Sequence, residues 1–174
     1  MKSLLVTGYS SFDLGIFRED DPRVLVIKKA IENRLLGYLA AGLEWLIFTG
    51  KLGFEFWTLE VARELQNQYP ELKLSTIFSF EDTGKNWNEA NQAKLAVFKS
   101  LDFVKYSFQS YENPQQLRLY NQFLVENSDA AFIFYDEENK ETKLKWLLAE
   151  IKTRENYEFD LLDFESLQEL ADDE

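Results

Sequence analysis

The sequence predicts one α/β domain of Rossmann-like architecture, with a mostly parallel sheet of about six strands and helices on both faces. Six short apolar runs alternate with segments whose apolar residues recur every three or four positions, which is the pattern of linked βαβ units. The 174 residues suit a single domain, and no repeat, linker or low-complexity segment divides residues 1–174. A hydrophobic content of 45% is ample for a packed core.

The first third of the chain predicts two strands with a helix between them. The apolar run over residues 3–7 stops at Gly8, which indicates a buried strand. Residues 23–41 carry apolar side chains at helical spacing, and Pro22 stands near the first turn, where its missing N–H costs little. These residues therefore predict an amphipathic helix. A second apolar run, 43–49, predicts the next strand.

The middle of the chain continues the same alternation. Helical spacing over residues 54–68 predicts a second helix, which ends before Pro70. A strand is predicted over 73–79 and, after an irregular loop, a helix over 88–100. The short apolar run 103–106 completes this part as a strand.

The last third predicts two further strands and three helices. A helix is expected over residues 114–127, and the strongly apolar run 130–135 predicts a buried strand. A helix over 142–154, a strand over 157–161 and a short helix from Phe164 follow. In such a sheet the ligand crevice lies beyond the carboxyl ends of the strands, where the strand order reverses. We therefore expect a ligand site in the loops at the strand ends.

Charge and missing residue types exclude several classes of function. The formal net charge is −12, which opposes binding to nucleic acid or anionic lipid. The chain has no His and no Cys, so it offers no imidazole base, thiolate nucleophile or disulfide, and no zinc site of the usual kinds. No signal peptide or membrane span is recognisable, and we expect a cytoplasmic protein without membrane insertion.

Most of the acidity lies in one terminal segment. Residues 155–174 contain nine acidic residues and no Lys or Arg, whereas residues 1–154 contain twenty-two acidic and nineteen basic residues. The part of the chain that carries the candidate site is thus nearly balanced in charge. An anionic small ligand is compatible with it, and the acidic segment is either solvated or in contact with a basic partner.

The loop after the first strand holds the first candidates, Gly8, Tyr9 and Ser10. Gly8 permits a sharp turn, and Ser10 offers a hydroxyl and an amide that can face an anion. A plain strand-to-loop turn explains these residues equally well.

The loop after the second strand holds Gly50, Lys51, Gly53 and Glu55. Two glycines three residues apart, between a strand and a helix, permit a tight turn and a close backbone approach where the helix N-terminus favours phosphate. The segment matches neither the dinucleotide fingerprint nor the P-loop. Glu55 either caps the first turn of the helix or stands beside the ligand, accepting hydrogen bonds from a ribose or acting as a general base.

Three further candidates are Trp87, Asn121 and Asp136. Trp87 either stacks on a nucleobase or packs as a hydrophobic staple before its helix. Asn121 fits an exposed helix position, and Asp136 begins an acidic loop that solvent alone explains. Because nothing in the spacing brings Glu55 and Asp136 together, we expect no metal site.

The order of these motifs resembles the YpsA family of Gram-positive bacteria. The resemblance runs over about residues 1–160. Its longest segment is TGKLGFEFW, residues 49–57. The other matching segments are 7–9, 12–17, 42–45, 85–87, 121–123, 128–129 and 135–136. The resemblance implies membership of the Rossmann-like SLOG superfamily and a nucleotide pocket at the first two strand-end loops. It also implies that Gly53 and Glu55 matter for function, with ADP-ribose or NAD-like ligands and a link to cell division.

The leading hypothesis is therefore a cytoplasmic regulator that binds a nucleotide derivative and acts through a protein partner in division. No cofactor is required, and an oligomer is compatible with the sequence. The alternative is a nucleotide N-glycoside hydrolase that uses Glu55 or Asp136. The related phosphoribohydrolases carry a P-G-G-x-G-T-x-x-E segment, and residues 135–142 lack its glycines, which weakens the enzyme hypothesis.

Overall fold

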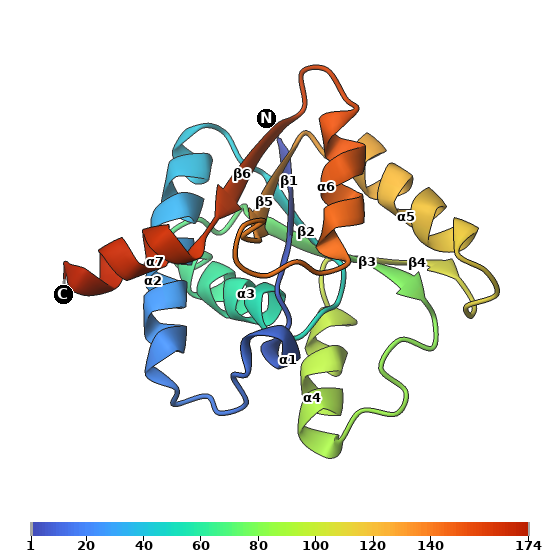
Figure 1. Cartoon of the computed structure of the whole chain (residues 1–174), viewed down its shortest axis with the longest axis horizontal. Coiled ribbons are helices and arrows are strands. Elements are labelled where there is room, and N and C mark those ends of the chain that lie inside the picture. The colour runs from blue at the N-terminus through green and yellow to red at the C-terminus, as the bar shows by residue number, and fades with distance from the viewer. Residues whose placement is uncertain (1, 174) are drawn as a thin grey trace.

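A computed structural model of the chain describes residues 2–173 and confirms the Rossmann-like α/β fold (Figure 1). In that range the sheet consists of six strands, all parallel. The strands are β1 (Ser3–Gly8), β2 (Trp45–Phe48), β3 (Lys73–Phe80), β4 (Phe103–Phe108), β5 (Ala130–Phe134) and β6 (Glu158–Leu162). The helices are α1 (Ser11–Leu14), α2 (Pro22–Ala40), α3 (Phe54–Leu65), α4 (Glu89–Phe98), α5 (Gln115–Glu126), α6 (Leu144–Lys152) and α7 (Phe164–Asp172).

The strand order is β4-β3-β2-β1-β5-β6, so its direction reverses between β1 and β5. Leu5 of β1 pairs with Ile47 of β2 on one side and with Ala131 of β5 on the other. In open parallel sheets, ligands bind beyond the carboxyl ends of the strands at such a reversal. The loops that follow β1 and β5 therefore flank the expected ligand position.

Helices cover both sides of the sheet (Figure 1). α2 packs against α3 and α7, and α5 packs against α6. At the carboxyl end of the sheet, the ring of Phe54 lies edge-on to those of Phe132 and Phe134, with centroids 5.3 and 5.5 Å apart. This aromatic cluster fixes the start of α3 against the end of β5. Within residues 2–173, no helix has both the length and the apolar character needed to cross a membrane.

Helix α1 lies where the sequence predicts a loop after the first strand. Ser10 is its N-cap and forms a reciprocal capping box with Asp13, while Gly15 ends the helix in the left-handed conformation at φ 65°. A four-residue helix has no apolar periodicity to read, so only its caps define it.

Candidate functional site

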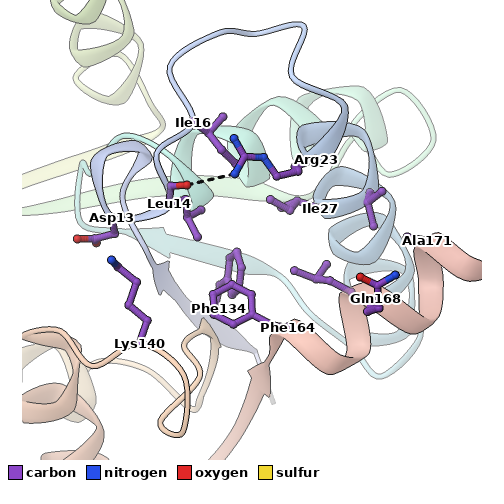
Figure 2. Close-up of a pocket in the computed structure, with 12 residues that line it drawn as sticks. Asp13, Leu14, Ile16, Arg23, Ile27, Phe134, Lys140, Phe164, Gln168 and Ala171 are labelled. Carbon is purple, nitrogen blue, oxygen red and sulfur yellow. Dashed lines mark hydrogen bonds between the residues drawn. The ribbon is translucent and has the colours of Figure 1, made fainter.

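A pocket of about 450 Å³ lies at the reversal of strand order (Figure 2). Its walls come from α1 and the segment after it, the first turns of α2, the end of β5, the loop that follows β5, and α7. We call it the switch-point pocket. It lies where the topology places a ligand, although it is lined by elements that are far apart in the sequence.

The switch-point pocket has an aromatic floor and a charged mouth. The rings of Phe134 and Phe164 meet edge-to-face with centroids 5.7 Å apart, and both line the pocket. Asp13, Arg23 and Lys140 bring three charges to it. Figure 2 shows the Lys140 side chain extending toward Asp13. This combination of apolar surface with a few polar groups is typical of sites for small molecules.

Arg23 and Lys140 differ in how firmly they are held. The Arg23 guanidinium donates to the Asp21 carboxylate at 2.6 Å and to the carbonyl oxygens of Leu14 and Gly15 at 3.4 and 3.3 Å. Lys140 is exposed, and its ammonium forms no ion pair within residues 2–173. Lys140 is therefore the cation that can meet an anionic ligand without first losing a partner.

Tyr9 anchors the loop that carries Lys140. Its buried hydroxyl accepts a hydrogen bond from the backbone N–H of Asp136 at 2.8 Å and donates to the carbonyl oxygen of Lys140. Its ring stacks on Phe164 with an interplanar angle of 2° and centroids 5.7 Å apart. Burial raises the pKa of Tyr9 to about 12, so the phenol stays protonated and keeps this arrangement at neutral pH. Tyr9 thus lies behind the wall of the pocket and holds that wall in position.

Gly8, the last residue of β1, and Ser10, the N-cap of α1, shape the same wall of the pocket. A Cβ on Gly8 would lie 2.7 Å from Phe54 and 2.8 Å from Phe134, so the aromatic cluster leaves room for glycine alone. The Ser10 hydroxyl accepts from the Asp13 N–H at 3.0 Å, and the Asp13 carboxylate accepts from the Ser10 N–H at 2.9 Å. This capping box holds Asp13 at the mouth of the pocket.

The turn between β2 and α3 is closed by contacts within the chain. Gly50 and Gly53 both have a φ of +91°, which L side chains rarely adopt. A Cβ on Gly50 would lie 2.2 Å from the Phe78 ring, and one on Gly53 would lie 2.4 Å from the Ser11 backbone nitrogen. Gly53 thus lets the backbone before α3 approach the first turn of α1 closely. Lys51 reaches back across the turn, and its ammonium donates to the Gly8 carbonyl oxygen at 3.3 Å.

Glu55 lies inside this turn and is fully buried, with 0% of its surface exposed. Its carboxylate accepts hydrogen bonds from the backbone N–H groups of Thr49, Gly50 and Lys51 at 2.7, 3.0 and 3.3 Å. It also accepts from the hydroxyls of Thr49 and, at 2.8 Å, of Thr7. Burial raises the pKa of Glu55, and the hydrogen bonds from Thr49 and Thr7 and the Lys51 charge oppose that rise. The carboxylate joins the ends of β1 and β2 to the start of α3.

Asp136, in the loop after β5, is also buried and accepts several hydrogen bonds, as Glu55 does. Its carboxylate accepts from the Glu138 N–H at 3.1 Å, the Asn139 amide at 2.8 Å and the Phe164 N–H at 3.1 Å. Burial opposes ionisation, but these hydrogen bonds outweigh it and lower the pKa of Asp136. The residue ties the loop after β5 to the first residue of α7, beside the pocket.

Trp87 and Asn121 lie apart from the switch-point pocket. Trp87 directly precedes Asn88, the N-cap of α4, and is half-buried against the core. The Gln92 side chain donates to its carbonyl oxygen at 3.3 Å, so the residue belongs to the loop before α4. Asn121 is half-buried on α5. Neither lines the pocket.

Sequence reasoning missed the residues that line the pocket itself. Arg23, Lys140 and Gln168 occupy ordinary polar positions of a helix, a loop and a second helix, so no motif marks them. The capping box between Ser10 and Asp13 was readable as an S-x-x-D pattern and would have pointed to the mouth of the pocket. Among residues 2–173 no three acidic side chains gather into a possible metal site.

The fold and the pocket together define an α/β protein of Rossmann-like type with a candidate ligand site at its topological switch point. The chain belongs to the YpsA family, because the family model described as "YspA SLOG family" matches residues 4–167. This confirms the resemblance that the sequence motifs indicated.

Its relatives include proteins of lactococci and streptococci. The chain is 60% identical over 169 residues to "UPF0398 protein YfdB" of Lactococcus lactis subsp. lactis, covering 97% of this chain and 96% of that protein. It is 54% identical over 170 residues to a UPF0398 protein of Streptococcus thermophilus, with 98% of both chains covered. It is 53% identical over 174 residues to a UPF0398 protein of Streptococcus agalactiae, covering 99% of this chain and 100% of that one.

Proposed function

We propose that the protein binds a nucleotide derivative in the switch-point pocket and that it is a regulatory binding protein. The observation that carries the proposal is the pocket itself, which places the Phe164 ring, packed against the buried Phe134, and the Lys140 ammonium in one cavity at the reversal of strand order. Membership of a SLOG family supports a nucleotide-related ligand.

The pocket offers a complementary group for each part of a nucleotide. The half-buried ring of Phe164 presents apolar surface for a base, and the fully buried ring of Phe134 packs against it. One Asp13 carboxylate oxygen is held by the Ser10 N–H, and the other is available to ribose hydroxyls. The Lys140 ammonium provides a point charge for a phosphate. ADP-ribose and NAD contain all three parts and are the derivatives that we propose to test first.

The role of Lys140 can be tested by calorimetry with AMP, ADP-ribose and NAD. We expect Lys140→Ala to weaken binding about tenfold, because a charge-assisted contact to phosphate is lost. Lys99→Ala is the matched control, since Lys99 is an exposed lysine at the C-cap of α4, outside the pocket. The proposal fails if the wild type binds none of the three compounds, or if both variants bind as the wild type does.

The same compounds test the hydrolase alternative. Both of its candidate carboxylates, Glu55 and Asp136, accept several hydrogen bonds from within the chain, which favours a holding role over general-base catalysis. We therefore expect no free base when the protein is incubated with AMP, NAD or ADP-ribose. Turnover that Glu55→Gln abolishes would replace the binding proposal with the hydrolase.

We further propose that the protein works in the cytoplasm and that its ligand state is read by a protein of the division machinery. The support is that α7 both lines the pocket and belongs to the acidic segment 155–174, so a ligand and a partner can contact the same helix. Microscopy of cells that lack the protein tests this part. Normal cell length and septum placement would remove the division link.

A further inference from the structure

Helix α7 brings a carboxamide to the switch-point pocket. Gln168 lines the pocket from this helix, on the same face as Phe164, Leu167 and Ala171. Figure 2 shows Gln168 and Lys140 at opposite ends of the pocket, with the rings of Phe134 and Phe164 between them. A ligand that meets both polar ends thus spans the aromatic floor.

We propose that Gln168 reads the edge of an adenine base whose ring lies over Phe164 and whose phosphate faces Lys140. The inference rests on the proposed function, because it assigns the orientation and the base of the nucleotide in that same pocket. It makes Gln168 the residue that determines base specificity.

The hydrogen bonding of Gln168 suits this role. Its Nε2 donates to the Asp172 carboxylate at 2.9 Å, one turn further along α7. A carboxylate only accepts, so this bond keeps Nε2 on the Asp172 side, and Figure 2 shows Oε1 on the pocket side. The amide oxygen and the second N–H remain free to form a pair of hydrogen bonds with one ligand. An amide oriented in this way distinguishes donor–acceptor patterns.

Adenine matches that pattern and hypoxanthine does not. Adenine offers an amino donor next to a ring-nitrogen acceptor, which pairs with the oxygen and N–H of a glutamine amide. Hypoxanthine has a carbonyl oxygen in place of the amino group, so two oxygens would face each other at the same position. The two bases have nearly the same size, so the apolar floor does not separate them.

The charges at the other end fix the direction of the nucleotide. Lys140 and Asp13 lie together at one end of the pocket (Figure 2), where a phosphate and ribose hydroxyls find a cation and an acceptor. The reverse orientation would place the phosphate beside the Asp172 carboxylate, which accepts from Gln168 at the far end, and away from the Lys140 ammonium that offsets the Asp13 charge at the near end. The charges therefore favour the orientation with the phosphate at Lys140.

Calorimetry with AMP and IMP tests the assignment on the full chain. We expect the wild type to prefer AMP, and we expect Gln168→Leu to lower AMP affinity about tenfold while leaving IMP affinity nearly unchanged. Gln115→Leu is the matched control, since Gln115 is an exposed glutamine in the first turn of α5, outside the pocket. Gln168 is itself exposed, so its replacement leaves the core intact, which circular dichroism checks.

The outcomes separate the two proposals. If the wild type binds neither AMP nor IMP nor the other nucleotides named above, the proposed function fails and this inference falls with it. If nucleotides bind and Lys140→Ala weakens them, but Gln168→Leu changes AMP and IMP equally or not at all, the assignment of Gln168 is overturned while the proposed function stands.

Discussion

Replacing Glu55 tests whether its buried carboxylate holds the strand ends together or contacts a ligand. In Glu55→Ala, the backbone N–H groups of Thr49, Gly50 and Lys51 lose their acceptor in a site with no exposed carboxylate surface. Each buried donor left without a partner costs about 1–3 kcal/mol, so we expect a loss of at least about 3 kcal/mol in unfolding free energy. Glu55→Gln keeps one oxygen for these amides, and we expect it to lose about 1–3 kcal/mol.

Urea unfolding followed by circular dichroism measures these losses. Glu64→Ala is the matched control, because Glu64 is an exposed glutamate on the same helix. If Glu55→Ala is no less stable than Glu64→Ala, the internal hydrogen bonds do not hold this turn and the reasoning is refuted. If Glu55→Gln keeps full stability but no longer binds nucleotides that the wild type binds, Glu55 contacts the ligand.

Two further predictions concern the loops on either side of the switch point. Hydrogen bonds lower the pKa of Asp136, so its ionised form stabilises the fold above the ordinary value of 3.8, and this stabilisation is lost as the pH falls through the native pKa. Unfolding free energies of the wild type and Asp136→Asn should therefore differ at neutral pH and converge in acid; a constant difference would contradict this. Gly53→Ala should destabilise the protein, because its φ is +91° and its Cβ would meet the Ser11 nitrogen at 2.4 Å. Gly37→Ala, whose Cβ meets nothing within 4 Å in α2, should gain about 0.5–1 kcal/mol in the same urea assay, and equal effects of the two changes would refute the argument.

The fold could be predicted because its signals are local. The apolar run 130–135 is a strand that is buried on both faces, and β5 occupies Ala130–Phe134 with every residue buried. The helix predicted over 23–41 begins at Pro22, next to its N-cap Asp21. Proline is favoured at this first position because its missing N–H costs little there. The order of the strands could not be predicted in this way, because it depends on which strands pair across long crossovers and no single segment encodes that pairing.

The candidate site was harder to predict, because sequence spacing shows where residues lie along the chain but not where their side chains point. The spacing of Gly50, Gly53 and Glu55 located a strand-to-helix turn correctly, but that pattern does not reveal that Glu55 points inward to Thr7 and Thr49. The pocket walls come from residues as distant as Asp13, Lys140 and Gln168. The pairing of β1 with β5 and the Tyr9 hydroxyl bring Lys140 near Asp13, and the packing of α7 on α2 adds Gln168.

The hydrogen bonds around the switch point favour ligand binding over catalysis as the role of this site. The two carboxylates that the sequence offered for acid–base chemistry, Glu55 and Asp136, both accept hydrogen bonds that hold loops in place. Tyr9 joins the loop after β1 to the backbone of the loop that carries Lys140, so this wall of the pocket is in place before any ligand binds. A pocket wall that is formed in advance costs less to order when a ligand binds, which favours the binding of a small molecule there.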